Sequence, residues 1–204
     1  MTPTTVTPTT VADESPVVAD EAPVLPAHPP PLRGEVAALA EVQRRLGHPT
    51  VVSAARGLSL FGEHAAGWLA AGAMGALTDQ PRRREWLVCA AAVATAHALS
   101  IAVKRVVRRA RPEHETLRVL VGTPSRLSFP SSHAASTTAA TVLYGGMLCR
   151  PLTPVLVPAM LASRLVLGVH YPTDVVAGSA LGAFIGVAVR RRLGRKNSRR
   201  RGWR

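Results

Sequence analysis

"SRLVLGVHYPTD", residues 163–174, places an arginine, a histidine and an aspartate in one otherwise apolar stretch between two apolar segments. Pro172 suits the first turn of a helix, so Asp174 falls in that turn, four residues after His170. The carboxylate can then accept a hydrogen bond from one imidazole nitrogen, which fixes the tautomer and leaves the other nitrogen free as a nucleophile. The stretch therefore predicts two apolar helices that meet at a polar site.

Five apolar segments make up most of the remaining chain, at residues 65–77, 86–103, 134–149, 152–163 and 175–189. They are nearly uncharged and apolar on all sides, although each is shorter than the roughly 20 residues of a comfortable membrane span. Gly178, Gly182 and Gly186 recur at every fourth position, which favours close helix packing in lipid. We therefore expect an all-α compact bundle, integral to the membrane, with about five transmembrane helices. A soluble protein with these segments as core helices is the alternative.

The N-terminal third divides into two parts. Residues 1–33 are rich in Thr and Pro without periodicity, which predicts a disordered tail, and they lack the basic start and apolar block of a signal peptide. Residues 34–64 carry apolar positions at helical spacing, which predicts one or two amphipathic helices interrupted near residues 47–49. The expected organisation is a tail (1–33), a helical domain (34–190) and a basic C-terminal tail (191–204).

The net charge is strongly positive. Lys and Arg number 25 against 12 Asp and Glu, giving a formal charge of +13, which indicates a polyanionic partner. Aromatic residues make up only 4%, so a base-stacking surface is not expected, although binding of nucleic acid or anionic membranes through the basic tail is a competing hypothesis. If the helices alternate in direction, the basic residues at 82–84, Arg150 and the C-terminal tail share one side, which the positive-inside rule makes cytoplasmic.

The opposite, extracytoplasmic side receives residues 104–133 and 164–174, and three motifs there can converge. "KRVVRRARP" contributes Lys104 and Arg111, "FPSSH" contributes Ser131, Ser132 and His133, and the opening stretch contributes Arg164. Three cations without matching carboxylates would repel one another unless an anion lay among them, and arginine forks suit phosphate oxygens. A helix that begins after Pro130 adds backbone donors, and His133 can protonate a leaving oxygen. No carboxylate cluster suits a metal, so neither metal nor cofactor is expected.

The order K-x6-RP, PSxH and SR-x5-H-x3-D resembles the three-part signature of the type 2 phosphatidic acid phosphatase (PAP2) and vanadium haloperoxidase superfamily. The resemblance covers roughly residues 55–190. It implies that Lys104, Arg111 and Arg164 bind phosphate with help from Ser131 and the backbone at Ser132, where the family usually has glycine. It also implies that His170 forms a phosphohistidine, that Asp174 orients it and that His133 is the acid.

Finer features, "FGEHAAGW" and "VGTPSRLSFPSSHAASTTAA", look most like actinobacterial decaprenylphosphoryl-phosphoribose phosphatases. That resemblance implies a membrane phosphatase of cell-envelope precursor synthesis. Its partners would be a polyprenyl-linked sugar phosphate as substrate and membrane lipids, without nucleic acid. An undecaprenyl diphosphate, phosphatidate or phosphatidylglycerophosphate phosphatase is an alternative, and so is a vanadium-dependent haloperoxidase, although that class resembles larger soluble proteins.

Overall fold

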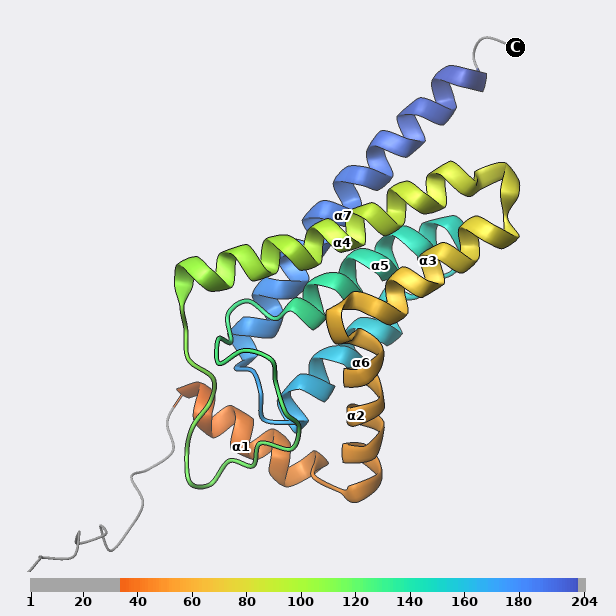
Figure 1. Ribbon diagram of the computed structural model, residues 1–204. Coiled ribbons are helices and arrows are strands. Elements are labelled where there is room, and N and C mark those ends of the chain that lie inside the picture. Colours follow the sequence, from red (N-terminus) through yellow and green to blue (C-terminus); the bar gives the residue numbers. More distant parts are fainter. Residues whose placement is uncertain (1–33, 202–204) are drawn as a thin grey trace, which may run out of the picture. The chain divides into compact units, whose positions relative to one another are not determined.

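The computed structural model describes residues 34–201 of the chain, with side chains to residue 195. These residues form α1 (Gly34–Leu46), α2 (Pro49–Gly62), η1 (Glu63–Ala65), α3 (Ala66–Thr78), η2 (Gln80–Arg82), α4 (Arg83–Val107), α5 (Ser132–Leu148), α6 (Thr153–Val166) and α7 (Pro172–Arg201) (Figure 1). Within this range no strand occurs, and β pairing is limited to one bridge between Ala110 and Leu127. The all-α class is therefore confirmed.

One of the expected interruptions matches a helix boundary. The interruption near residues 47–49 falls between α1 and α2, where Pro49 opens the second helix. The basic segment from residue 191 continues α7 as helix through Arg201. The expected tail at residues 1–33 lies outside the described residues.

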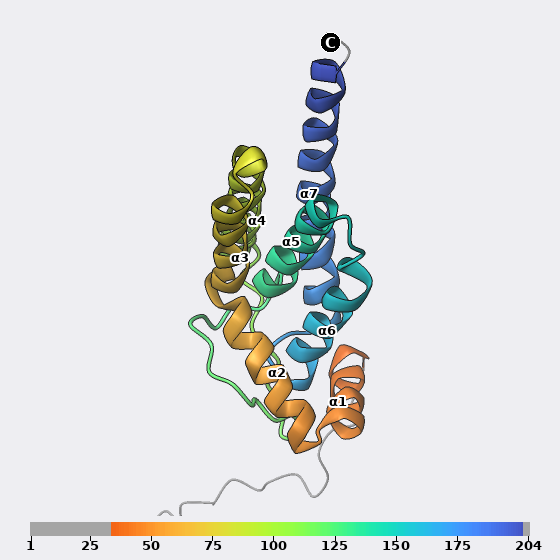
Figure 2. The same cartoon turned by 90° about the vertical axis from the view of Figure 1, so that its right-hand side faces the viewer.

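Helix α5 is the centre of the bundle and is buried along most of its length. It lies between α3 and α4 on one side and α6 and α7 on the other (Figure 2). A Cβ atom added at Gly178 would overlap the Ser131 carbonyl oxygen, and one at Gly182 would overlap the Ala135 carbonyl oxygen. The glycine repeat therefore lets the backbones of α7 and α5 touch, as the sequence pattern predicts.

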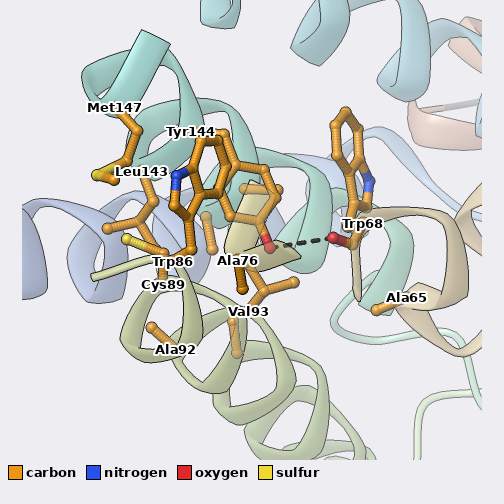
Figure 3. Close-up of a cluster of buried hydrophobic side chains, with 13 residues drawn as sticks. Ala65, Trp68, Ala76, Trp86, Cys89, Ala92, Val93, Leu143, Tyr144 and Met147 are labelled. Atoms are coloured by element: carbon orange, nitrogen blue, oxygen red, sulfur yellow. Dashed lines mark hydrogen bonds between the residues drawn. The ribbon is translucent and has the colours of Figure 1, made fainter. Parts of the chain in front are cut away.

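The main hydrophobic core lies between α3, α4 and α5 (Figure 3). Tyr144 packs against Trp86, with ring centroids 5.4 Å apart, and its hydroxyl donates to the Trp68 carbonyl at 3.0 Å. The Trp68 indole donates in turn to Thr137 Oγ1 at 3.0 Å. These bonds satisfy the polar tips of the large aromatic side chains, as burial requires.

Two of the described helical segments are long and apolar enough to cross a membrane, Gln80–Val107 and Pro172–Arg195. The other three apolar segments form shorter helices of 13 (α3), 17 (α5) and 14 (α6) residues. Large apolar side chains point outward from both long segments, among them Leu87, Leu99 and Phe184. Helix length thus supports two of the five expected spans.

Candidate active site

A cavity of about 320 Å³ lies at the end of the bundle where α4 ends and α5 begins. Its wall also includes residues from α2, α6 and the loop between α4 and α5, which runs down to α1 and back (Figure 1). Six of the eight residues expected at the site line this cavity: Lys104, Arg111, Ser132, His133, Arg164 and His170. Three motifs separated by tens of residues are therefore brought together.

The three cations are held in place by neutral oxygens. Lys104 Nζ donates to the Ser128 carbonyl at 2.9 Å and to the Leu127 carbonyl at 3.2 Å. Arg111 Nε donates to the Ser125 carbonyl at 2.8 Å, and its Nη1 donates to the Val169 carbonyl. Such contacts orient a cation without neutralising it, so the charge stays available to an anion.

Arg164 is the most buried of these cations, with 2% of its surface exposed. Its Nη1 donates to Ser59 Oγ at 2.7 Å, while within the described part of the chain its Nε has no hydrogen-bond partner. A buried guanidinium with an unused donor is costly unless a ligand completes it. Burial also lowers the pKa of Arg111 to about 10, which leaves that side chain charged at neutral pH.

His170 is 2% exposed, and its Nδ1 lies 3.5 Å from Asp174 Oδ2. That distance is long for a hydrogen bond, and among the described residues this nitrogen has no closer partner. Burial, followed by the charges of Arg111, Arg164 and Lys104, holds the pKa of His170 well below its ordinary value. The ring is therefore neutral near pH 7, which is the state a nucleophile requires.

Asp174 does not line the cavity but lies behind His170, at the start of α7. Its side chain is fully buried. Oδ2 accepts from the Tyr171 amide at 2.8 Å, and Oδ1 accepts from Arg109 Nη1 at 3.0 Å. Both oxygens are thus fixed, so that the carboxylate faces the imidazole from one side.

Ser131 and Ser132 have different surroundings. Ser131 is fully buried, does not line the cavity, and caps α5 by accepting from the Ala134 amide at 3.4 Å. Ser132 lines the cavity from the first position of α5. It is absent from the described non-glycine residues with positive φ, so serine fits where the family usually has glycine.

His133 enters the cavity from the first turn of α5 and meets α2. Its Nε2 lies 3.0 Å from the Ser59 carbonyl oxygen. A carbonyl only accepts hydrogen bonds, so this nitrogen carries the proton. A Cβ at Gly62 would come within 2.6 Å of the His133 ring, so this glycine makes room for it.

Sequence reasoning missed Arg109 and Glu35. The Arg109 guanidinium donates to Asp174 Oδ1, to Thr173 Oγ1 at 2.7 Å and to Glu35 Oε2, and it lies 4.0 Å from the centroid of the Tyr171 ring. Glu35 Oε1 accepts from the Thr173 amide at 2.9 Å. The run "KRVVRRARP" contains five basic residues, and nothing local shows which of them faces the carboxylate.

Sequence comparison assigns the family. A sequence model described as the PAP2 superfamily matches residues 85–198, which is more than half of the chain. The chain belongs to the PAP2 superfamily. The signature residues, from Lys104 to Asp174, lie inside the matched segment, and the family together with relatives named as phosphatases makes the protein a phosphoric monoester hydrolase.

Close relatives are named as phosphatases. The chain is 54% identical over 158 residues to a decaprenylphosphoryl-5-phosphoribose phosphatase of Mycobacterium tuberculosis, covering 77% of this chain and 89% of that protein. It is 58% identical over 147 residues to the protein of the same name from Mycolicibacterium smegmatis, covering 72% and 82% respectively.

Two solved structures share the fold. One is a transmembrane PAP2-type phosphatidylglycerolphosphate phosphatase from Bacillus subtilis, with a TM-score of 0.61, 21% identity, and coverage of 76% of this chain and 83% of that one. The other is LpxE from Aquifex aeolicus, with a TM-score of 0.61, 18% identity, and coverage of 76% and 94%. These likenesses show a shared fold, and two of the described helical segments are long and apolar enough to cross a membrane.

Proposed function

We propose that this PAP2-type phosphatase removes the phosphate from a polyprenyl-linked phosphoribose phosphate through a phosphohistidine intermediate. The observation that carries the proposal is the cavity itself. Three cations with neutral partners surround a space that also holds a neutral, buried histidine backed by a carboxylate. The relatives named as decaprenylphosphoryl-5-phosphoribose phosphatases support the choice of substrate.

In the first step Lys104, Arg111 and Arg164 hold the phosphate oxygens, together with amides at the start of α5. The free nitrogen of His170 attacks phosphorus while the ester bond to the sugar oxygen breaks. Asp174 stabilises the positive charge that develops on the imidazole. His133 enters this step as an imidazolium: its Nε2 proton stays hydrogen-bonded to the Ser59 carbonyl oxygen, and its Nδ1 proton goes to the departing sugar oxygen, so the dephosphorylated lipid leaves as an alcohol.

In the second step water attacks phosphorus and the P–N bond breaks. His133, now without that proton, takes one from the water, and inorganic phosphate leaves. The cations serve both steps because they neutralise charge on the same equatorial oxygens. No step requires a metal ion.

The proposed orientation places about five helices across the membrane, with the cavity on the extracytoplasmic side. The opposite end of the bundle carries the basic residues that the positive-inside rule uses. There Arg82 donates to the Met147 carbonyl at 2.8 Å, and Arg150 and Arg190 line a common depression. The helix from residue 191 extends this basic end, which we assign to the cytoplasm.

A substrate panel tests the function. Purified protein in detergent receives a polyprenyl phosphoribose phosphate, phosphatidate, phosphatidylglycerophosphate or undecaprenyl diphosphate, and inorganic phosphate is measured. We expect the highest kcat/KM on the first substrate. Preference for another lipid would replace the substrate assignment. Halide oxidation with vanadate and peroxide, without phosphate release, would indicate a haloperoxidase instead.

The intermediate is tested with substrate carrying labelled phosphate. Rapid quenching should leave label on the protein that is stable in alkali and lost in acid, as expected for a phosphohistidine. His170→Asn should abolish both labelling and turnover. His114→Asn is the matched control, because this histidine lies in the loop outside the cavity. Turnover by the His170→Asn protein at the wild-type rate would rule out the covalent step.

A further inference from the structure

One wall of the cavity carries polar groups that phosphate chemistry does not use. Glu63, His64 and His97 line the same space as the three cations. Among the described residues of this wall, Glu63 is the sole acidic side chain. A carboxylate repels a phosphate, so its place beside an anion site points to a contact other than the phosphate, in addition to its attraction to Arg164.

His97 occupies the face of α4 that points into the cavity. His97, Ile101 and Lys104 all line it, and their spacing of four and three residues puts them on one helical face. Seven residues of helix separate His97 from Lys104 by about 10 Å along the axis. His97 therefore lies about two helical turns from Lys104 on the same wall of the cavity.

One buried polar atom on this wall lacks a hydrogen-bond partner from the described residues. His97 Nδ1 is buried and, within the described part of the chain, has no hydrogen-bond partner. The His64 ring lies opposite, with ring centroids 6.2 Å apart and planes tilted by 50°. A small hydroxylated group placed between the rings could bond both, since imidazole offers one donor and one acceptor.

The backbone that presents Glu63 and His64 is unusual. His64 has φ 50° and the next residue, Ala65, has φ 60°, so two successive non-glycine residues adopt the left-handed conformation. This turn joins α2 to α3 and brings both side chains to the cavity. Strained conformations of this kind persist where the surrounding structure imposes them, and they concentrate at ligand sites.

We propose that Glu63, His64 and His97 form a subsite for the hydroxyl groups of the sugar that carries the phosphate. The inference rests on the proposed function and names the part of the substrate that this wall of the cavity binds. Carboxylate oxygens accept from neighbouring ribose hydroxyls, as they do in nucleotide sites. The imidazoles complete the set with a donor and an acceptor, while Ile101 and Leu60 supply apolar surface.

The test compares two substrates. One is the polyprenyl phosphoribose phosphate, and the other is the same lipid with a sugar that lacks both ring hydroxyls. Glu63→Gln and His97→Phe should each lower kcat/KM for the first substrate by about 10- to 100-fold, the loss expected for one hydrogen bond to a charged or buried partner. Both variants should leave the hydroxyl-free substrate within about twofold of wild type, because the phosphate site is intact.

Of two further variants, one is a control and the other extends the test to His64. Glu115→Gln removes an exposed carboxylate of the loop outside the cavity and should change neither substrate. His64→Asn keeps a side chain that tolerates left-handed backbone and should lower only the first activity.

The outcomes separate this inference from the function on which it rests. Equal losses on both substrates, or no loss on either, would overturn the subsite alone. Wild-type protein that leaves the sugar phosphate uncleaved would overturn the proposed function, and the subsite with it. Variant folding is checked by the midpoint of thermal unfolding in detergent.

Discussion

Removal of the Arg109 cation is the perturbation that most directly tests how the proposed nucleophile, His170, is held. Arg109 Nη1 lies 3.0 Å from the fully buried Oδ1 of Asp174, and its guanidinium is 30% exposed. At this separation Coulomb's law with an effective dielectric constant of about 20 gives roughly 5 kcal/mol. Solvent screening and the competing contact with Glu35 reduce this, so we take about 1.5–3 kcal/mol, the usual value for a hydrogen bond to a charged group.

Arg109→Gln should therefore lower kcat/KM by about 10- to 100-fold. Without the arginine, Asp174 keeps its hydrogen bond from the Tyr171 amide but loses the hydrogen bond to its Oδ1. It therefore holds the His170 ring less firmly during attack. The acidic limb of the kcat/KM profile should also move to higher pH, because a buried carboxylate has lost the cation that favours its ionised form. A purely structural role for Arg109 would not move that limb.

The assay measures phosphate release across pH 4.5–8, with thermal unfolding in parallel. Arg108→Gln is the matched control, since this neighbouring arginine is exposed and should leave rate and pH profile unchanged. Arg109→Lys keeps the positive charge but loses the planar guanidinium that donates to several acceptors at once, so it should retain an intermediate activity. A folded Arg109→Gln protein with kcat/KM within twofold of wild type and an unshifted acid limb would refute the reasoning.

The remaining predictions concern packing, protonation and inhibition. Gly182→Ala should destabilise the protein by about 1–3 kcal/mol, seen as a lower midpoint of thermal unfolding, because its Cβ would overlap the Ala135 carbonyl oxygen. Gly57→Ala is the control: a Cβ there has nothing within 4 Å, so the substitution should be neutral or slightly stabilising. Equal effects of the two substitutions would contradict the packing argument. Because the pKa of His170 is lowered in the folded state, the unfolded chain binds more protons below pH about 6.5, so stability should fall as pH falls from 7.5 to 5.5. His170→Asn should reduce that slope, and a slope that stays the same would assign it to other groups. Vanadate should inhibit competitively with substrate, since its five-coordinate adduct with His170 resembles the transition state; full activity in excess vanadate would contradict nucleophilic attack by this ring.

Much of the site follows from short-range features of the sequence. Pro172 opens α7, which puts Asp174 in its first turn beside His170. The glycines at positions 178 and 182 anticipate the contact between α7 and α5. These features could be predicted from the sequence because helix capping, helical periodicity and residue size depend on only a few neighbouring residues.

The sequence was a poorer guide to which apolar segments are long enough to cross a membrane. The sequence predicts five apolar segments, and the structure forms a helix at each, but two of the described helices have the length and hydropathy of a full membrane crossing. Composition alone therefore could not fix how each short helix relates to lipid.

What the sequence determined by itself is the all-helical class, the family signature and the identity of six residues that line the cavity. What only the tertiary structure decided is which distant side chains support them: Arg109 reaches Asp174 across 65 residues and Glu35 across 74, and Arg164 reaches Ser59 across 105. It likewise decided that Glu63, His64 and His97 share one wall. The physical reason is that local rules set the direction of a side chain within its own helix, whereas its partner depends on how whole helices pack.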